Sequence, residues 1–327
     1  MSSPVFRTER SIFDQSPLVR LEAPVYVIGT VNMDITGTPE EKLQGGGASP
    51  GSITLSPSGT GLNIAENLCL LGRKVSLVTI TGDDEYAEII RRQCIRSGID
   101  MQYSMTDSQG RTSAYLRLNE QGGSLHAAVS DTAVCEGLTV ERIRPLLPLL
   151  NHGSMVIADA NLPEETLAWI GQNVTVPLAA VPVSTAKVLR LKPLLPALTI
   201  LRASMRETEM LIGFPILGDG DLGRAADALH RMGVQRVYIT LGDRGVWADD
   251  RREGGKLLPG APGPVVNTSG CEDAFMAAAA DAYLKGAGTL DGARRALAAA
   301  AICAGDTAAV STRLSQEAIE VKLNFPV

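Results

Sequence analysis

The residues best suited to chemistry stand in NTSGCEDAF at 267–275, where a polar turn with a carboxylate leads directly into the alanine-rich pattern AFMAAAADAYLKG. Backbone N–H groups at a helix start have no partner in the helix and lie at the positive end of its dipole. The turn at Gly270 would therefore stabilise a bound phosphate. Asp273 could take a proton from an attacking hydroxyl. Glu272 places a negative charge where an incoming phosphate would otherwise meet only backbone.

A second group follows the short apolar run at 25–29, which predicts a strand. Asn32 and Asp34 come after its C-terminal end, where ligands bind in open α/β sheets. The carboxylate of Asp34 could accept hydrogen bonds from two sugar hydroxyls. A turn that uses Asn and Asp for local hydrogen bonds is the alternative interpretation.

A third group lies in SGTGLNIAENLCLLG at 58–72. Gly59 and Gly61 allow close approach of the backbone, and the amide of Asn63, in the first turn of an amphipathic helix, could reach a ligand hydroxyl. The alternative is a glycine turn that leads into a helix, with Asn63 near its N-cap.

The strand pattern in ITLGDRGVW at 239–247 ends in Thr240 and is followed by Gly242 and Gly245, which would line a second glycine-rich surface. Two such turns far apart in sequence suit a nucleotide that lies across them. Other familiar motifs are excluded: GASPG at 47–51 lacks the strand-turn-helix context of a hydrolase nucleophile, and neither GxGxxG nor GxxxxGK[ST] occurs.

The elements that must position these residues alternate between strand and helix, which predicts a doubly wound α/β domain with a mostly parallel sheet and helices on both faces. Two stretches, about 34–58 and 111–129, break the alternation and predict a small β lid. We expect a poorly ordered extension at 1–23 and one domain at 24–327. The predicted strands are 25–29, 75–80, 154–158, 177–181, 197–201 and 236–241, and the predicted helices are 62–71, 84–97, 163–172, 205–213, 221–232, 270–286 and 289–309.

The composition predicts a cytoplasmic protein with a small-molecule partner. A net charge of −6 without a basic cluster argues against nucleic acid or an anionic membrane as the main partner. The five cysteines are scattered and never spaced as CxxC, which argues against a disulfide framework or a zinc site. The first 22 residues lack the apolar region of a secretory signal, and the most apolar later stretch, at 296–305, is too short to span a bilayer.

Taken in chain order, these motifs resemble the ribokinase-like (PfkB) family of sugar and nucleoside kinases, most closely its pseudouridine-phosphorylating branch. The resemblance covers nearly everything from about residue 25 onward. NTSGCEDAF marks the whole family, whereas the second and third segments are more specific to that branch. The segments are VIGTVNMDITG at 27–37, SPGSITLSPSGTGLNIAENLCLLG at 49–72, VIADANLPEETLAWI at 156–170, VPVS at 181–184, ETEMLIG at 207–213 and NTSGCEDAF.

The resemblance implies ATP-dependent, magnesium-assisted phosphorylation of the 5′-hydroxyl of pseudouridine or a related nucleoside or sugar, by a homodimer joined through the lid. Asp273 matches the catalytic base. The remaining positions follow from the same match or from the motifs above: Gly270, Cys271 and Glu272 in the anion hole; Asn32, Asp34, Gly59, Gly61, Asn63 and Asn161 toward the substrate; Ser204, Thr240, Gly242, Gly245 and Thr268 toward the nucleotide; and Glu207 toward magnesium.

The departures from the family pattern gather in the same machinery. GCED stands in place of GAGD, Ser204 replaces the Asn of NxxE, RAS at 202–204 replaces KPN, Ser58 and Gly59 replace Gly-Gly, and Val181 stands where the pseudouridine branch has Asp. Two hypotheses follow. The chain is an active kinase, or it is a catalytically weakened relative that binds a nucleoside or nucleotide as a sensor or partner.

Overall fold

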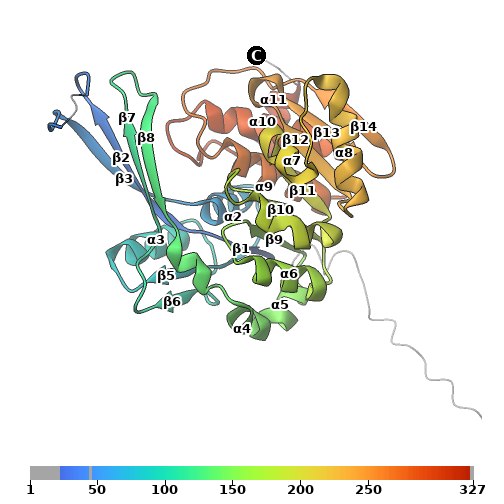
Figure 1. The fold of residues 1–327 in the computed structure, drawn as a ribbon, viewed down its shortest axis with the longest axis horizontal. Helices are drawn as coiled ribbons and strands as arrows, with labels where there is room; N and C mark the ends of the chain where they lie inside the picture. Colours follow the sequence, from blue (N-terminus) through green and yellow to red (C-terminus); the bar gives the residue numbers. More distant parts are fainter. Residues whose placement is uncertain (1–22, 44–45, 325–327) are drawn as a thin grey trace, which may run out of the picture.

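The computed structural model describes residues 23–43 and 46–324, and its centre is an eight-stranded sheet (Figure 1). The strand order is β14-β13-β12-β11-β10-β9-β1-β4. From β12 to β4 neighbouring strands run parallel, and β13 and β14 add an antiparallel hairpin at one edge. The strands are β1 (Val25–Ile28), β4 (Val75–Val78), β9 (Met155–Asp159), β10 (Leu178–Val181), β11 (Ile200–Ser204), β12 (Arg236–Thr240), β13 (Val246–Asp250) and β14 (Gly254–Leu258).

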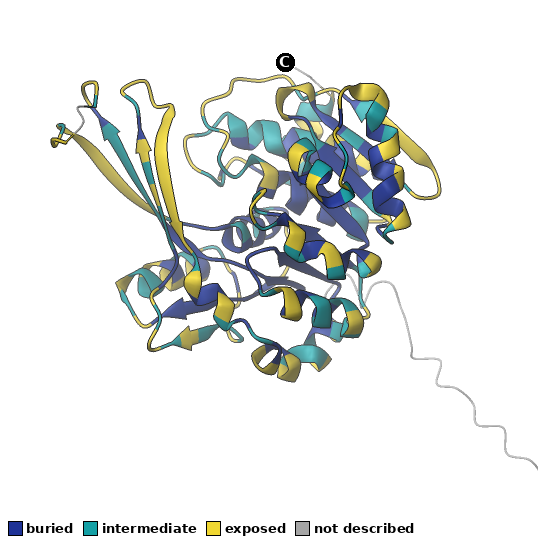
Figure 2. Ribbon diagram, viewed as in Figure 1, coloured by how far each residue is buried: buried dark blue, intermediate teal, exposed yellow. Residues whose placement is uncertain are grey.

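Successive residues of the central strands point to opposite faces of the sheet, so each strand contributes to two hydrophobic cores. Val25 and Val27 pack with helices α2, α9 and α10 on one face, and Tyr26 and Ile28 pack with α6 and α8 on the other. The buried centre is visible in Figure 2, and the predicted doubly wound fold is confirmed. The helices are α2 (Thr60–Leu70), α3 (Glu85–Arg96), α4 (Val140–Ile143), α5 (Leu147–His152), α6 (Glu164–Asn173), α7 (Met205–Ile212), α8 (Leu222–Arg231), α9 (Cys271–Leu284), α10 (Thr289–Ala304) and α11 (Gln316–Asn324).

A separate four-stranded sheet extends to one side of this body and confirms the predicted lid (Figure 1). Its strand order is β3-β2-β7-β8, with β2 and β7 parallel and the outer pairs antiparallel. Its strands are β2 (Asn32–Pro39), β3 (Gly51–Ser58), β7 (Ala114–Asn119) and β8 (Leu125–Asp131). A third, two-stranded sheet pairs β5 (Ile80–Gly82) with β6 (Met105–Asp107).

The structure differs from the predicted elements near the C-terminal half. The strand predicted at 197–201 is β11 at Ile200–Ser204, because Pro193 and Pro196 hold the preceding segment in the 3-10 helix Val188–Ala197. The hairpin β13–β14 and the helix α11 were not predicted. The predicted extension at 1–23 lies outside the described residues except for residue 23. Among the described residues, none of the helices is both long and apolar enough to cross a membrane.

Candidate active site

The predicted site residues converge because parallel strands end at one edge of the sheet. Ser204 and Thr240 are the last residues of the neighbouring strands β11 and β12, and their Cα atoms pair in register. Asn32 follows β1 by a short turn, and Asn161 follows β9. Helices α2 and α9, which pack against each other, begin at this same edge and supply Asn63 from α2.

Asp273 and Asn63 form the central contact of the site. The side-chain Nδ2 of Asn63 donates a 2.8 Å hydrogen bond to Oδ2 of Asp273, across 210 residues of sequence. Both side chains are buried. Burial raises the pKa of Asp273 to about 7, although the hydrogen bond from Asn63 and the charge of Arg202 both lower it. Asn63 therefore orients the carboxylate that could act as a base, a role that its position in the sequence did not indicate.

Glu272 does not project into open space but turns toward the ends of β11 and β12. Its Oε2 lies 2.9 Å from Nη1 of Arg202, and its Oε1 accepts a 3.3 Å hydrogen bond from the hydroxyl of Thr240. The Glu272 side chain is 51% exposed, whereas that of Arg202 is 2% exposed. From the sequence, Arg202 was evident only as part of RAS in place of KPN. An arginine inside an otherwise apolar strand requires an anionic partner, and that requirement is the signal that could have identified it.

Glu207, the residue assigned to magnesium, has a local structural role. Its Oε2 accepts a 2.7 Å hydrogen bond from the backbone N–H of Ser204, and the Ser204 hydroxyl accepts from the N–H of Glu207, which completes a capping box at the start of α7. The same carboxylate lies 3.7 Å from Arg202. A direct metal contact would compete with both partners.

No cluster of three or more His, Cys, Asp or Glu side chains within the described ranges is spaced to hold a metal ion. Mg²⁺ keeps several water ligands and is commonly bound through substrate phosphates with one or two carboxylates. Glu207 is the carboxylate near these strand ends that could supply such a ligand when ATP is bound, and its assignment to magnesium stays a prediction.

The glycines of the site divide by what surrounds them. A Cβ at Gly270 would lie 1.9 Å from the carbonyl oxygen of Ala309, and the residue has a φ of +75°, so only glycine fits at this turn. Within the described part of the chain, no side chain caps the N-terminus of α9; the N–H of Cys271 donates only to the carbonyl of Thr268 at 3.4 Å, and the N–H groups of the next two residues have no partner within the helix. Gly242 also has a positive φ, of +66°, but faces open space.

Gly245 and Gly59 are glycines because backbone lies against them. A Cβ at Gly245 would be 2.1 Å from the carbonyl oxygen of Leu258, and one at Gly59 would be 2.7 Å from that of Thr30. Gly61 also lies against backbone, since a Cβ there would be 2.8 Å from the carbonyl carbon of Gly29, and its contact with a substrate stays a prediction. It is buried, and its N–H donates a 2.9 Å hydrogen bond to the carbonyl of Thr30, so that N–H is not available to a substrate. Gly61 serves the packing of α2 on the end of β1.

On the substrate side, Nδ2 of Asn32 donates to Oδ1 of Asp34, which lies on β2 at the base of the lid. Burial raises the pKa of Asp34, and hydrogen bonds from Ser58 and Asn32 lower it. The local Asn–Asp bond that the sequence left open is therefore present. A carboxylate can accept more than two hydrogen bonds, so the half-buried Asp34 could still accept one from a ligand hydroxyl.

Asp159, at the end of β9, organises the neighbouring turns. Its carboxylate accepts from the N–H of Thr30 at 2.7 Å and from the N–H of Asn161 at 2.8 Å. Lys187 in turn donates a 2.5 Å hydrogen bond to Oδ1 of Asn161. The sequence assigned no role to Asp159 or Lys187. They hold Asn161, the predicted substrate-side residue, in a fixed orientation.

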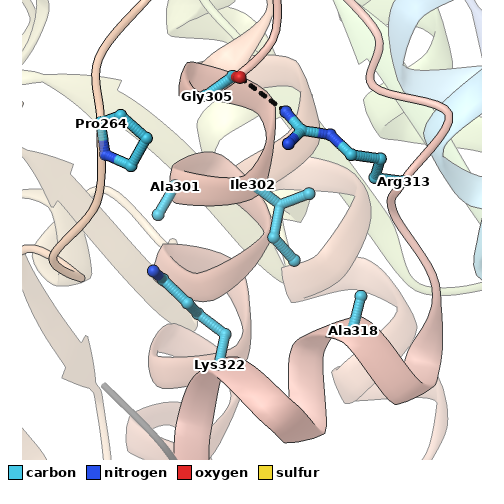
Figure 3. A pocket seen from close by; sticks show the side chains of 7 residues that line it. All are labelled: Pro264, Ala301, Ile302, Gly305, Arg313, Ala318 and Lys322. Carbon is cyan, nitrogen blue, oxygen red and sulfur yellow. Dashed lines mark hydrogen bonds between the residues drawn. The ribbon is translucent and has the colours of Figure 1, made fainter. Parts of the chain in front are cut away.

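The remaining predicted positions lie on the turn before α9 and at its first residue. Thr268 is exposed, and its carbonyl accepts a long, 3.4 Å hydrogen bond from the N–H of Cys271. The thiol of Cys271 is half-buried, forms no disulfide, and donates a weak 3.7 Å hydrogen bond to the carbonyl of Asn267. A cavity of about 230 Å³ lies beside α10 and α11, and none of the predicted site residues lines it (Figure 3). Its walls are Pro264, Ala301, Ile302, Gly305, Arg313, Ala318 and Lys322.

Comparison with known proteins assigns the chain and its fold to a family. Over 278 residues the chain is 35% identical to the uncharacterized sugar kinase YeiI of Escherichia coli (strain K12), covering 84% of this chain and 76% of that protein. It is 32% identical over 264 residues to the pseudouridine kinase of the same strain, covering 80% and 84%. A carbohydrate kinase structure from Agrobacterium tumefaciens matches with a TM-score of 0.82 and 28% identity over 93% of this chain and 98% of that chain.

The structure of Arabidopsis thaliana ribokinase complexed with ribose and ATP shares the fold, with a TM-score of 0.80 and 21% identity over 93% of this chain and 99% of that chain. The family model described as pfkB family carbohydrate kinase matches residues 23–315. The chain therefore belongs to the pfkB family of carbohydrate kinases, phosphotransferases with an alcohol group of a sugar or nucleoside as acceptor.

Proposed function

We propose that this protein is an ATP-dependent kinase that phosphorylates the 5′-hydroxyl of pseudouridine or a related nucleoside or sugar. The observation that carries the proposal is the contact between Asp273 and Asn63: a buried carboxylate at the start of α9 is hydrogen-bonded to the substrate-side helix α2 at 2.8 Å. The 32% identity to a pseudouridine kinase supports this substrate class. The ribokinase complex with ribose and ATP supports the donor.

In the proposed reaction, Asp273 accepts the proton of the sugar hydroxyl as the hydroxyl oxygen attacks the γ-phosphorus and the bond to the β-phosphate oxygen breaks. A base is most effective when its pKa lies near the working pH, and burial brings the pKa of Asp273 to about 7. The uncapped N–H groups of α9 would stabilise negative charge on the transferred phosphoryl group. Mg²⁺, when bound with ATP, would neutralise charge on the phosphates.

The main objection to catalysis is weakened by the position of Glu272. A unit charge at about 4 Å from a phosphate repels it by ~4 kcal/mol at an effective dielectric constant of ~20. Here the Glu272 carboxylate contacts Arg202 at 2.9 Å, and the positive charge of Arg202 offsets the extra negative charge of Glu272, which the family's GAGD pattern does not have. This favours an active kinase over the alternative, a weakened relative that only binds nucleoside or nucleotide.

We also propose that the lid joins two copies of the chain in a homodimer. Residues that pair between neighbouring strands lie on the same face of the lid sheet. Ile35 pairs with Leu55 on one side and with Leu116 on the other, and Leu116 pairs with Val129, so these four side chains share one face. Leu55, Leu116 and Val129 are at least 50% exposed. A continuous exposed apolar face of this kind marks an interaction surface. Asp34, the residue before Ile35 on β2, lies on the opposite face of the lid sheet.

The proposal is tested by incubating the purified protein with ATP, Mg²⁺ and a panel that includes pseudouridine, uridine, guanosine, inosine and ribose. The Asp273→Asn variant is the control, because it keeps the shape and the hydrogen bond from Asn63 but removes the base. We expect turnover of a nucleoside at the 5′ position, identified by NMR of the product. Turnover no higher than that of the variant would refute catalysis. Nucleoside binding without turnover would support the alternative.

A further inference from the structure

Arg202 is a buried cation whose charge is paired but whose hydrogen-bond donors are only partly satisfied. Its side chain is 2% exposed, in the middle of β11. Nη1 lies 2.9 Å from Glu272 and 3.7 Å from Glu207, but neither contact is aligned as a hydrogen bond. Among the described residues, Nε and Nη1 of Arg202 have no hydrogen-bond acceptor. A buried donor left without an acceptor is costly, so this guanidinium would gain from an anion with more oxygens in better positions.

The Glu272 side chain, which contacts Arg202, is free to rotate. Glu272 is 51% exposed and stands in the first turn of α9, where its Oε1 accepts a 3.3 Å hydrogen bond from Thr240. The carboxylate thus occupies a position between a cation, a hydroxyl and a helix start, and these three groups also favour a phosphate. Rotation would return Glu272 to water at little cost, whereas Arg202 lies within the strand layer and cannot follow it.

We propose that the Glu272 carboxylate is an internal substitute for a phosphate group of the nucleotide, seated on Arg202 and Thr240, and that a nucleotide phosphate displaces it to contact Arg202. The inference rests on the proposed function, because it takes the phosphate to be that of ATP. It makes Arg202 a phosphate-binding residue that is covered in the nucleotide-free protein. Nucleotide affinity is then reduced by the fraction of molecules in which Glu272 still occupies the site.

The test is a set of binding measurements by calorimetry with ATP, inorganic tripolyphosphate and adenosine, none of which requires turnover. We expect Glu272→Gln to bind ATP and tripolyphosphate about tenfold more tightly than wild type, which corresponds to about 1.4 kcal/mol. Adenosine, which has no phosphate, should bind equally to both. Glu320→Gln is the matched control, because Glu320 on α11 is likewise half-exposed, at 54%, and pairs at 2.5 Å with Arg295 on α10, which is 18% exposed. This variant should bind ATP and tripolyphosphate as wild type does.

A double-mutant cycle separates displacement from simple repulsion. If Glu272 competes for Arg202, the gain from Glu272→Gln disappears in an Arg202→Lys or Arg202→Gln background, depending on which variant folds. If Glu272 only repels phosphate, the gain persists or grows without Arg202, and the proposal is wrong. Equal or weaker binding of ATP and tripolyphosphate by Glu272→Gln alone also overturns it. A wild type that phosphorylates nucleosides while Glu272→Gln shows no gain would refute this inference and leave the proposed function intact.

Discussion

Replacing Asp273 with Asn gives a direct test of its environment through the pH dependence of stability. The folded pKa of Asp273 is raised to about 7 by burial, and an aspartate in an unfolded chain titrates near 3.9. The folded state therefore binds the proton more tightly than the unfolded state. Stability that is present at low pH is lost as the pH rises from about 4 to about 7, because the unfolded chain ionises while the buried carboxyl does not.

The magnitude follows from that interval. Between about pH 5 and pH 7, the free energy of unfolding of wild type should fall by about 2 kcal/mol relative to the Asp273→Asn variant, and the difference should level off above about pH 7.5. Other groups titrate alike in the two proteins and cancel in the difference. The assay is urea unfolding of both proteins at a series of pH values, with ligand absent. A difference that stays constant across this range would show that Asp273 ionises as an ordinary aspartate and would refute the argument from burial.

Three further predictions follow from the same geometry. Asn63→Leu removes the hydrogen bond to the ionised base, so the acidic limb of the pH profile of kcat/KM should move upward by about one unit, and an unmoved limb would contradict the contact. Gly270→Ala should destabilise the protein by more than ~3 kcal/mol, whereas Gly242→Ala, with open space around it, should cost only ~1–2 kcal/mol in thermal or urea unfolding. Leu116→Lys should convert the proposed dimer to a monomer in analytical ultracentrifugation, while Leu217→Lys, an exposed leucine outside the lid, should not.

Much of the fold could be predicted because its signals are local. The run VYVIG predicts a buried strand wherever it packs, and the alternation of such runs with helices limits the fold to a doubly wound sheet. The same applies to Asp273, whose position at a glycine turn before an alanine-rich helix is visible in nine residues. The edge hairpin β13–β14 was missed because only one of its strands continues a strong apolar pattern, and the other is GGKLL, whose glycines weaken the strand signal.

The contacts of the site could not be predicted in the same way, because each depends on residues that only the fold brings together. Asn63 has the sequence context of a ligand-binding or capping amide, yet its partner is Asp273, 210 residues away. Gly61 has the context of a ligand-facing glycine, but the end of β1 occupies the space beside it. The residue types indicated that both positions mattered. Only the packing of α2 against β1 and α9 determines what they contact.

Glu272 and Arg202 show why departures from a motif must be interpreted together. Considered alone, a carboxylate in the anion hole suggests loss of function, and the replacement of KPN by RAS suggests the same. In the structure the two residues meet at 2.9 Å, with Thr240 as a second partner of the carboxylate. Arginine presents more donors than lysine in a planar fork, so it suits a position that faces Glu272 and Glu207 together. Decay of an unused site would not be expected to match a new anion with a buried cation. The pairing instead supports the proposed phosphate site with a rearranged charge, so the affinity of Glu272→Gln for phosphate is more informative than the motif.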